Sequence, residues 1–168
     1  MINIRKAHKK DIEILSILWN ELILFHKSKN IIFPITQDWK KLKEEELEWI
    51  IESRQVLIYV AEADAKVIGY IRGSIRKIPP LYDIKNEGSI EEIYIMPEYR
   101  RRGLATQLVR CIMEDFKEKE VDYIDIHVDQ DNDIGQKFWD GLGFSTVSTH
   151  KRYQMGREKK NEFSVEQE

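Results

Sequence analysis

Cysteine and long apolar runs are the scarcest features of this 168-residue chain, and each scarcity excludes a class of protein. The one cysteine, Cys111, excludes internal disulfides and any metal site built from several cysteines. No apolar run approaches the ~20 residues that a transmembrane helix needs, and the N-terminal residues lack the pattern of a secretory signal. We therefore expect a cytoplasmic protein with no membrane partner.

An excess of basic charge is also missing. Lysine and arginine total 27 against 30 aspartates and glutamates, which gives a formal net charge of -3 at pH 7. A protein that binds nucleic acid needs a basic face to release counterions, so we expect no nucleic-acid partner. The hydrophobic content of 42% and the charged content of 34% fit a soluble globular chain.

The alternation and helical spacing of apolar residues predict the element order β-α-α-β-β-β-α-β-α-β. This order favours an α+β fold (an α/β sandwich), in which a mixed, mostly antiparallel sheet carries helices on both faces. We expect one domain over residues 1–156 and a frayed tail over residues 157–168. The expected strands are 2–7, 55–62, 66–75, 89–96, 123–128 and 145–155, and the expected helices are 11–26, 38–53, 103–120 and 133–144.

A cationic turn, "YRRRGLAT" at residues 99–106, follows a strand that Pro97 stops and precedes a helix. The unpaired N–H groups of a helix N-terminus attract anions, and Gly103 lets a ligand approach the backbone closely. The turn is therefore predicted to bind a polyphosphate, although a solvated basic loop would show the same residues. Neither a Gly-Lys-Ser/Thr phosphate loop nor a G-x-G-x-x-G run after a strand is present, which disfavours ATP, GTP and NAD.

Three stretches together resemble a known family. The pattern R-x-x-G-x-A from Arg100 to Ala105, the run "IMPEYR" before it and the later "NDIGQKFWDGLGF" resemble the GNAT superfamily of N-acetyltransferases. The resemblance implies the GNAT-like acyl-CoA N-acyltransferase fold, acetyl-CoA as co-substrate, no metal, and direct attack by a primary amine of a small molecule or peptide. The residues it assigns to acetyl-CoA are Ile93, Tyr94, Ile95, Arg100, Arg101, Arg102, Gly103, Leu104, Ala105, Thr106, Asn132 and Trp139.

The resemblance also assigns a catalytic base. The run "IEEIYIMPEYR" is similar to spermidine/spermine N-acetyltransferases, in which the carboxylate at the position of Glu91 is associated with deprotonating the amine. Strand alternation places Glu91 and Glu92 on opposite faces, so at most one of them shares a side with the amine. A plain salt bridge is the alternative role for Glu91.

The chain departs from the family pattern in its second motif. Trp139 stands where the family commonly has an acidic tyrosine, and Gly135 stands in place of alanine. An indole N–H is no proton source, so solvent or Tyr94 would have to protonate the leaving thiolate. Trp139 also fits a packing role, and Asn132 also fits a helix N-cap. A coenzyme A-binding module without turnover is therefore the alternative function.

The acceptor amine is the least determined part of the prediction. By analogy of fold, the first two helices and their connection would supply the acceptor site, including Phe25, Phe33 and Trp39. Acidic residues near Glu91 favour a cationic small molecule as the acceptor, and a peptide amine is the alternative acceptor. Members of the family are often dimers, so a homodimer is compatible with the resemblance.

Metal binding is not expected. Asp125, His127 and Asp129 share a strand face, but such a set more often meets solvent or makes hydrogen bonds. The other histidines, His8, His26 and His150, have no partner at a diagnostic spacing.

Overall fold

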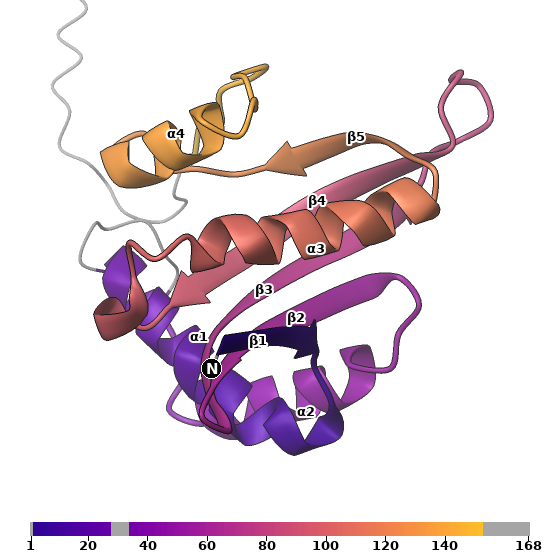
Figure 1. Cartoon of the computed structure of the whole chain (residues 1–168). Helices are drawn as coiled ribbons and strands as arrows, with labels where there is room; N and C mark the ends of the chain where they lie inside the picture. The colour runs from indigo at the N-terminus through magenta and orange to yellow at the C-terminus, as the bar shows by residue number, and fades with distance from the viewer. Residues whose placement is uncertain (1, 28–33, 153–168) are drawn as a thin grey trace, which may run out of the picture. The chain divides into compact units, whose positions relative to one another are not determined.

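The computed structural model describes residues 2–27 and 34–152, which form two compact units divided after Asp131. Figure 1 shows the elements in chain order. They are β1 (Ile2–Lys6), η1 (Lys9–Asp11), α1 (Ile12–Lys27), α2 (Trp39–Ile50), β2 (Val56–Ala63), β3 (Lys66–Lys77), β4 (Asn86–Ile95), η2 (Pro97–Tyr99), α3 (Leu104–Glu118), β5 (Val121–Ile126) and, in the second unit, α4 (Asp133–Asp140).

The sheet of the first unit is mixed and mostly antiparallel, as predicted. Its five strands follow the chain order β1-β2-β3-β4-β5, and only β4 and β5 run parallel. The hairpin between β2 and β3 turns at Asp64 and Ala65, which both adopt positive φ (48° and 64°). Parallel neighbouring strands need a long connection, and here η2 and α3 form the connection between β4 and β5.

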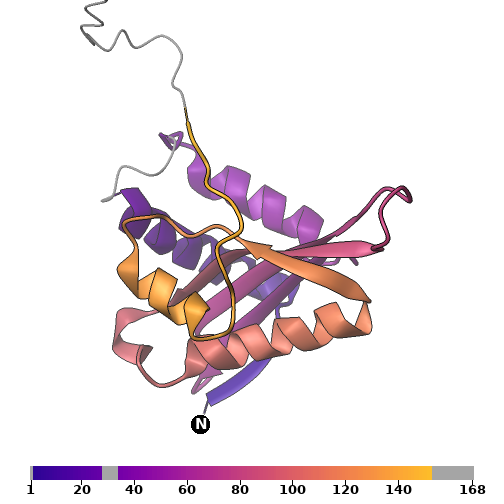
Figure 2. The ribbon, with the colours of Figure 1, turned by 90° about the horizontal axis from the view of Figure 1, so that it is seen from above.

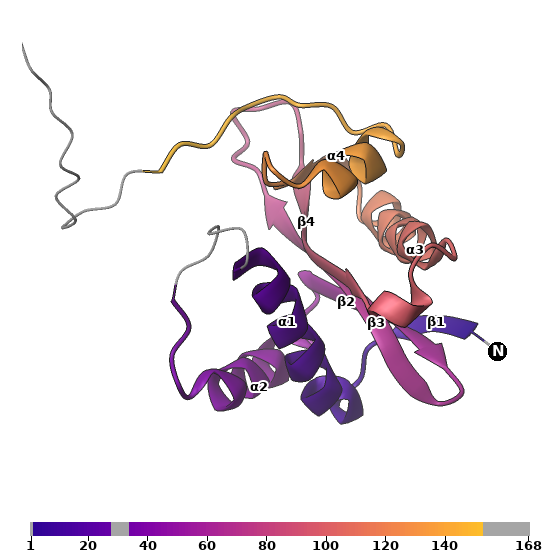
Figure 3. The ribbon, with the colours of Figure 1, turned by 90° about the vertical axis from the view of Figure 1, so that its left-hand side faces the viewer.

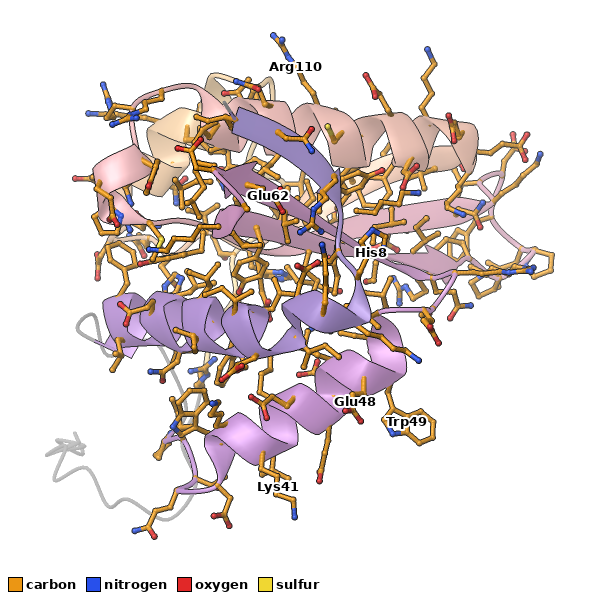
Figure 4. The ribbon with its side chains drawn as sticks, turned by 60° about the horizontal axis from the view of Figure 1, so that its bottom comes forward. His8, Lys41, Glu48, Trp49, Glu62 and Arg110 are labelled. Atoms are coloured by element: carbon orange, nitrogen blue, oxygen red, sulfur yellow. The ribbon has the colours of Figure 1, made fainter. Side chains whose placement is uncertain are left out.

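Helices cover both faces of this sheet. Figure 2 shows α1 and α2 on one side of the strands and α3 on the other, and Figure 3 shows the same layers from the side. Figure 4 shows Lys41 and Trp49 pointing outward from α2 and Arg110 pointing outward from α3. The labelled faces of α2 and α3 therefore lie in solvent, while their apolar faces are buried, as amphipathic helices require.

Two apolar layers hold the first unit together. On the α1/α2 side the buried residues include Leu15 and Leu18 of α1 and Val60 and Tyr70 of the sheet. On the α3 side a Cβ added at Gly73 would lie 2.7 Å from Cδ1 of Ile112 and 3.1 Å from Cζ of Phe116. Gly73 therefore allows close packing at this point, and a larger residue there would also clash with the backbone carbonyl of Ser89 on β4, 2.6 Å away.

The expected last strand is wrong over its described part. Residues 145–152 form no strand, and the rest of the expected strand and the expected tail lie outside the described residues. The segment is almost entirely polar, and Val147, its one large aliphatic residue in the described part, is 83% exposed. Alternation without an apolar face to bury does not stabilise a strand.

Other boundaries moved by a few residues. The connection between the expected strands 66–75 and 89–96 is shorter, because β3 extends to Lys77 and β4 begins at Asn86. Asp38, where the expected helix 38–53 begins, is the N-cap residue of α2, but its side chain makes no capping hydrogen bond in the described structure. Within residues 2–27 and 34–152, no helix is both long and apolar enough to cross a bilayer.

Candidate active site

An open strand edge lies in the middle of the sheet, where β4 and β5 separate. Their parallel pairing runs from Asn86–Val121 to Ile90–Ile126, and β4 continues to Ile95. Figure 1 shows the two strands drawing apart beyond that last pair. Over residues 91–95, β4 is therefore paired only with β3 in the described part of the chain.

The backbone groups of Ile93 and Ile95 point to this open edge. Next to them, the N–H of Met96 donates to the carbonyl of Ile68 on the β3 side (2.9 Å). Because successive residues of a strand direct their N–H and C=O groups to alternate sides, Ile93 and Ile95 direct theirs away from β3. These are the groups that an extended ligand would use to pair with β4.

The N-terminus of α3 follows this edge directly along the chain. Gly103 is its N-cap residue, with φ of 75°, and a Cβ built there meets no atom within 4 Å. The first hydrogen bond of the helix runs from the N–H of Gln107 to the carbonyl of Gly103 (3.1 Å). The N–H groups of Leu104, Ala105 and Thr106 therefore have no partner inside the helix, an arrangement that favours an anion.

The three arginines of the turn differ in their contacts. Arg100 donates from Nε to the carbonyl of Ile95 (2.8 Å), and its guanidinium lies 5.5 Å from the ring centroid of Tyr94. Arg102 donates to the carbonyl of Glu98 (3.1 Å). Arg101 makes no hydrogen bond or ion pair with the described residues. All three side chains are exposed at the helix entrance, so their charges are available to an anionic ligand.

A β-bulge changes the expected positions of the two acidic residues of β4. Arg72 of β3 lies opposite Glu92 and the next residue, Gly73, lies opposite Ile90, so Glu91 is the extra residue. An extra residue breaks the alternation of side chains along a strand. The expectation that Glu91 and Glu92 lie on opposite faces is therefore wrong.

Both carboxylates reach the same arginine. Arg72 Nε lies 3.1 Å from Glu91 Oε2, and Arg72 Nη1 lies 3.5 Å from Glu92 Oε1. Ser74 Oγ, two residues further along β3, hydrogen-bonds to Glu91 Oε1. Because Arg72 and Ser74 lie on the same side of β3, both glutamates are on that side as well.

Glu92 belongs to a buried polar network on the α1/α2 side. It accepts a hydrogen bond from the hydroxyl of Tyr70 (3.0 Å), and Lys43 Nζ of α2 lies 3.4 Å away. Burial and the charge of Glu92 raise the pKa of Tyr70 well above its usual value. Burial opposes the charge of Arg72, but Glu92, Glu46 and Glu91 raise the pKa of this guanidinium overall. Glu92 is thus fully engaged by the protein, while Glu91 is the more exposed carboxylate.

Asn132 and Trp139 lie in the second unit. The Oδ1 of Asn132 accepts a hydrogen bond from the N–H of Gly135 (3.1 Å), so the N-cap interpretation is confirmed. The Trp139 ring makes edge contacts with Phe138 and Phe144, each with centroids 5.0 Å apart. The packing interpretation of Trp139 fits these contacts. A contact of either residue with acetyl-CoA stays a prediction.

The predicted acceptor residues are only partly described. Phe25, near the end of α1, is 39% exposed. Trp39, the first residue of α2, has its ring centroid 5.9 Å from that of Trp19. Phe33 lies outside the described residues. An acceptor role for these aromatic residues stays a prediction.

Asp129, one of the residues not expected to bind a metal, makes a contact that the sequence did not predict. His26 Nδ1 of α1 lies 3.1 Å from Asp129 Oδ2, which follows β5, although 103 positions separate the two residues. In the described part of the chain, no group of three or more His, Cys, Asp or Glu residues is placed to hold a metal ion. No spacing pattern in the sequence signals a pair this distant.

Comparisons with known proteins bear on the family and the fold. A family model described as "Acetyltransferase (GNAT) family" matches residues 17–144. An N-alpha-acetyltransferase of Sulfurisphaera tokodaii is 27% identical over 110 residues, which cover 61% of this chain and 65% of that protein. The chain thus spans less than two thirds of the length of this relative.

Solved structures match over nearly the whole chain. A predicted acetyltransferase from Clostridium acetobutylicum, solved with acetyl-CoA, is 21% identical with a TM-score of 0.77, and the match covers 92% of this chain and 96% of that one. An aminoglycoside N-acetyltransferase solved with CoA is 24% identical with a TM-score of 0.74, covering 92% and 94%. At these identities the likeness establishes a shared fold, which supports the predicted sandwich.

Proposed function

Since the chain belongs to the GNAT family of acetyltransferases, we propose that it transfers an acetyl group from acetyl-CoA to a primary amine by direct attack. The observation that carries the proposal is the continuity between the open edge of β4 and the free N–H groups at the start of α3. The edge at Ile93–Ile95 fits an extended pantetheine arm, and the entrance of α3 fits a pyrophosphate. Arg100, Arg101 and Arg102 add positive charge there.

The chemistry needs a base more than an acid. A primary amine has a pKa near ~10.4, so supplying it neutral at pH 7 costs about 4–5 kcal/mol. A leaving thiolate with a pKa near ~8.5 costs only about 2 kcal/mol to release. The amine nitrogen forms its bond to the thioester carbon, the carbon–sulfur bond breaks, and the amine proton passes to Glu91, directly or through water.

Glu91 is our choice of base because it lies where β5 leaves β4, and it is less enclosed than Glu92. Tyr94 is a source for the proton that the thiolate takes up. Burial and the charge of Glu21 raise the pKa of the Tyr94 phenol, so the phenol carries its proton at neutral pH. Solvent is the other source, and Trp139 is not one.

The acceptor in this proposal is a small cationic amine. The carboxylates of Glu46, Glu91 and Glu92 lie on the α1/α2 side of the sheet, where they attract positive charge. One protein of similar fold is named as an aminoglycoside N-acetyltransferase, and aminoglycosides are small cationic amines. The proposal also includes a cytoplasmic location, which the single cysteine supports. It includes a homodimer as well, because members of the family are often dimers.

We also propose that residues 1–156 act as one acetyltransferase domain. The support is the family match at residues 17–144, which continues past the division after Asp131 and includes α4. A coenzyme A-binding module without turnover is the second candidate, and Trp139 in place of a tyrosine is the observation that favours it.

Two measurements separate these functions. Acetyl-CoA at ~100 times its dissociation constant should stabilise the protein by about 2.7 kcal/mol in a thermal-shift experiment. Thiol release should then be followed with polyamines, aminoglycosides, amino acids and peptides. Turnover with one class of amine supports the enzyme, and tight binding without turnover of any amine supports the module. Absence of any shift with acetyl-CoA contradicts both.

A further inference from the structure

We propose that Arg72 and Ser74 are positioning residues that hold the Glu91 carboxylate in place for proton transfer, an inference that rests on the proposed function. The two residues contact different oxygens of the carboxylate: Ser74 Oγ reaches Oε1, and Arg72 Nε lies 3.1 Å from Oε2. Both come from β3, the strand opposite the bulge. A carboxylate that contacts a fixed group at each oxygen has little freedom to rotate.

Arg72 is itself fixed from a second direction. Its Nη1 donates to Glu46 Oε1 of α2 at 2.7 Å and lies 3.5 Å from Glu92 Oε1. Only 16% of its side chain is exposed. Lys43 of α2 contacts both Glu46 (2.9 Å) and Glu92 (3.4 Å), which completes the cluster. Arg72 therefore cannot leave Glu91 without breaking contacts to α2 and β4.

The contact of Arg72 Nε with Glu91 is close but poorly aligned. The Nε atom is buried and makes no hydrogen bond of acceptable geometry, although Glu91 Oε2 lies at ion-pair distance. A carboxylate that accepts several well-aligned hydrogen bonds is a weak base, because those bonds stabilise its charge. The geometry here orients Glu91 by charge and leaves a lone pair of Oε2 available for the proton of the amine.

Arg72 also separates two like charges. The bulge brings Glu91 and Glu92 to the same side, and neighbouring carboxylates resist simultaneous ionisation. The positive charges that face them are Arg72 from β3 and Lys43 from α2, and Glu46 adds a third negative charge. Removing Arg72 would leave the two carboxylates on one side of the sheet without the cation that contacts both of them.

The kinetic test uses Arg72→Gln, Arg72→Lys and Ser74→Ala, with Arg76→Gln as the matched control. Arg76 pairs with Glu87 across the same two strands, but its side chain is 74% exposed and does not contact Glu91. For the first variant we expect kcat to fall roughly 10- to 100-fold with the KM for acetyl-CoA unchanged.

The other variants give graded expectations. Ser74→Ala should lower kcat by a smaller factor, and it does not disturb the contacts to α2, so it serves where Arg72→Gln fails to fold. Arg72→Lys should restore part of kcat, because it restores the charge beside Glu91. A kcat for Arg72→Gln and Ser74→Ala equal to that of Arg76→Gln would overturn the proposal.

A double-mutant cycle separates this inference from the proposed function. Thermal unfolding of Arg72→Gln, Glu91→Gln and the double variant measures their coupling without any turnover, and Arg76 with Glu87 gives the control cycle. If the wild type acetylates no amine, the proposed function fails, and the cycle still shows whether Arg72 holds Glu91. A coupling no larger than that of the exposed control pair would overturn the positioning role.

Discussion

Arg100 donates a hydrogen bond from Nε to the backbone carbonyl of Ile95 at 2.8 Å, so the first arginine of the turn is tied to the open edge of β4. Arg101, the next residue, makes no such contact with the described residues and adopts a positive φ of 63°. Two adjacent arginines of one turn therefore differ in role. Arg100 stabilises the turn against β4, and the charge of Arg101 is not paired within the described residues.

This difference predicts different effects of two alanine substitutions. Arg100→Ala should lower the free energy of unfolding by about 1 kcal/mol, because it removes the bond to Ile95 and the contact with the Tyr94 ring. Arg101→Ala should leave stability unchanged and weaken acetyl-CoA binding, with a smaller loss at high salt. Thermal unfolding and isothermal titration at two salt concentrations would measure both. Equal stability losses would contradict the assignment.

Substitutions of Glu91 and Glu92 should also have different effects, one on turnover and the other on stability. Glu91→Gln should lower kcat at neutral pH by about 10²- to 10⁴-fold, the usual contribution of a general base, and leave acetyl-CoA affinity unchanged. Glu92→Gln should instead lower the free energy of unfolding by about 1–3 kcal/mol, because it disturbs the buried contacts to Tyr70 and Lys43. Steady-state kinetics and chemical denaturation of both variants provide the comparison. Unchanged turnover in Glu91→Gln would remove it as the base.

Gly103 provides a test of the phosphate site. Its φ of 75° is unfavourable for other residues, but a side chain there meets no atom of the protein. Gly103→Glu should therefore fold with a loss of about 1–2 kcal/mol and lose acetyl-CoA binding through clash and charge. Gly143 is the matched control, with φ of 90° and equally open surroundings. Gly143→Glu should show a similar stability loss with acetyl-CoA affinity retained, and equal losses of affinity would contradict the site.

The junction between β1 and α1 predicts a pH dependence of stability. The carboxylate of Asp11 accepts hydrogen bonds from Arg5 (2.7 Å) and from the N–H of His8 (2.8 Å), and Arg5 also contacts Glu62, which Figure 4 labels. Burial opposes ionisation, but Arg5 and His8 hold the pKa of Asp11 below its ordinary 3.8. A carboxyl group whose pKa is lowered by folding stabilises the protein above its unfolded pKa and loses that contribution as it becomes protonated.

Asp11→Asn should therefore cost about 1–3 kcal/mol at pH 7. The difference in free energy of unfolding between the variant and the wild type should disappear as the pH falls below 3.8, the ordinary pKa of this carboxyl group. Denaturation curves from pH 7 to pH 2.5 would measure it. Glu48→Gln, at an exposed position of α2, should show no gap at any pH. A gap for Asp11→Asn that stays constant into acid would contradict the role of its charge.

Local patterns predicted the fold well, including the helix that begins after the cationic turn. The apolar face of α3 is visible in the sequence as Leu108, Ile112 and Phe116, and all three are buried. The turn at residues 99–106 was readable because its arginines, its glycine and the helix start are contiguous. Such features depend on neighbours in the chain, and the sequence contains those directly.

The geometry around Glu91 was not predictable in this way. The bulge arises from the register between β3 and β4, which no single segment specifies, and it reverses the expected side of one glutamate. The pairing of His26 with Asp129 depends on how α1 lies relative to the end of β5. The strand expected near Val147 failed for the opposite reason, because a local alternation had no apolar surface to cover.

The separation of β4 from β5 also bears on self-association. Unpaired strand backbone is a template on which another polypeptide strand adds, and most proteins shield it with charge, proline or a covering element. Here the template lies inside the sheet, between Ile90 and Met96. A ligand that pairs with this stretch blocks it, so saturation with acetyl-CoA should suppress aggregation of the purified protein beyond what its thermal stabilisation explains.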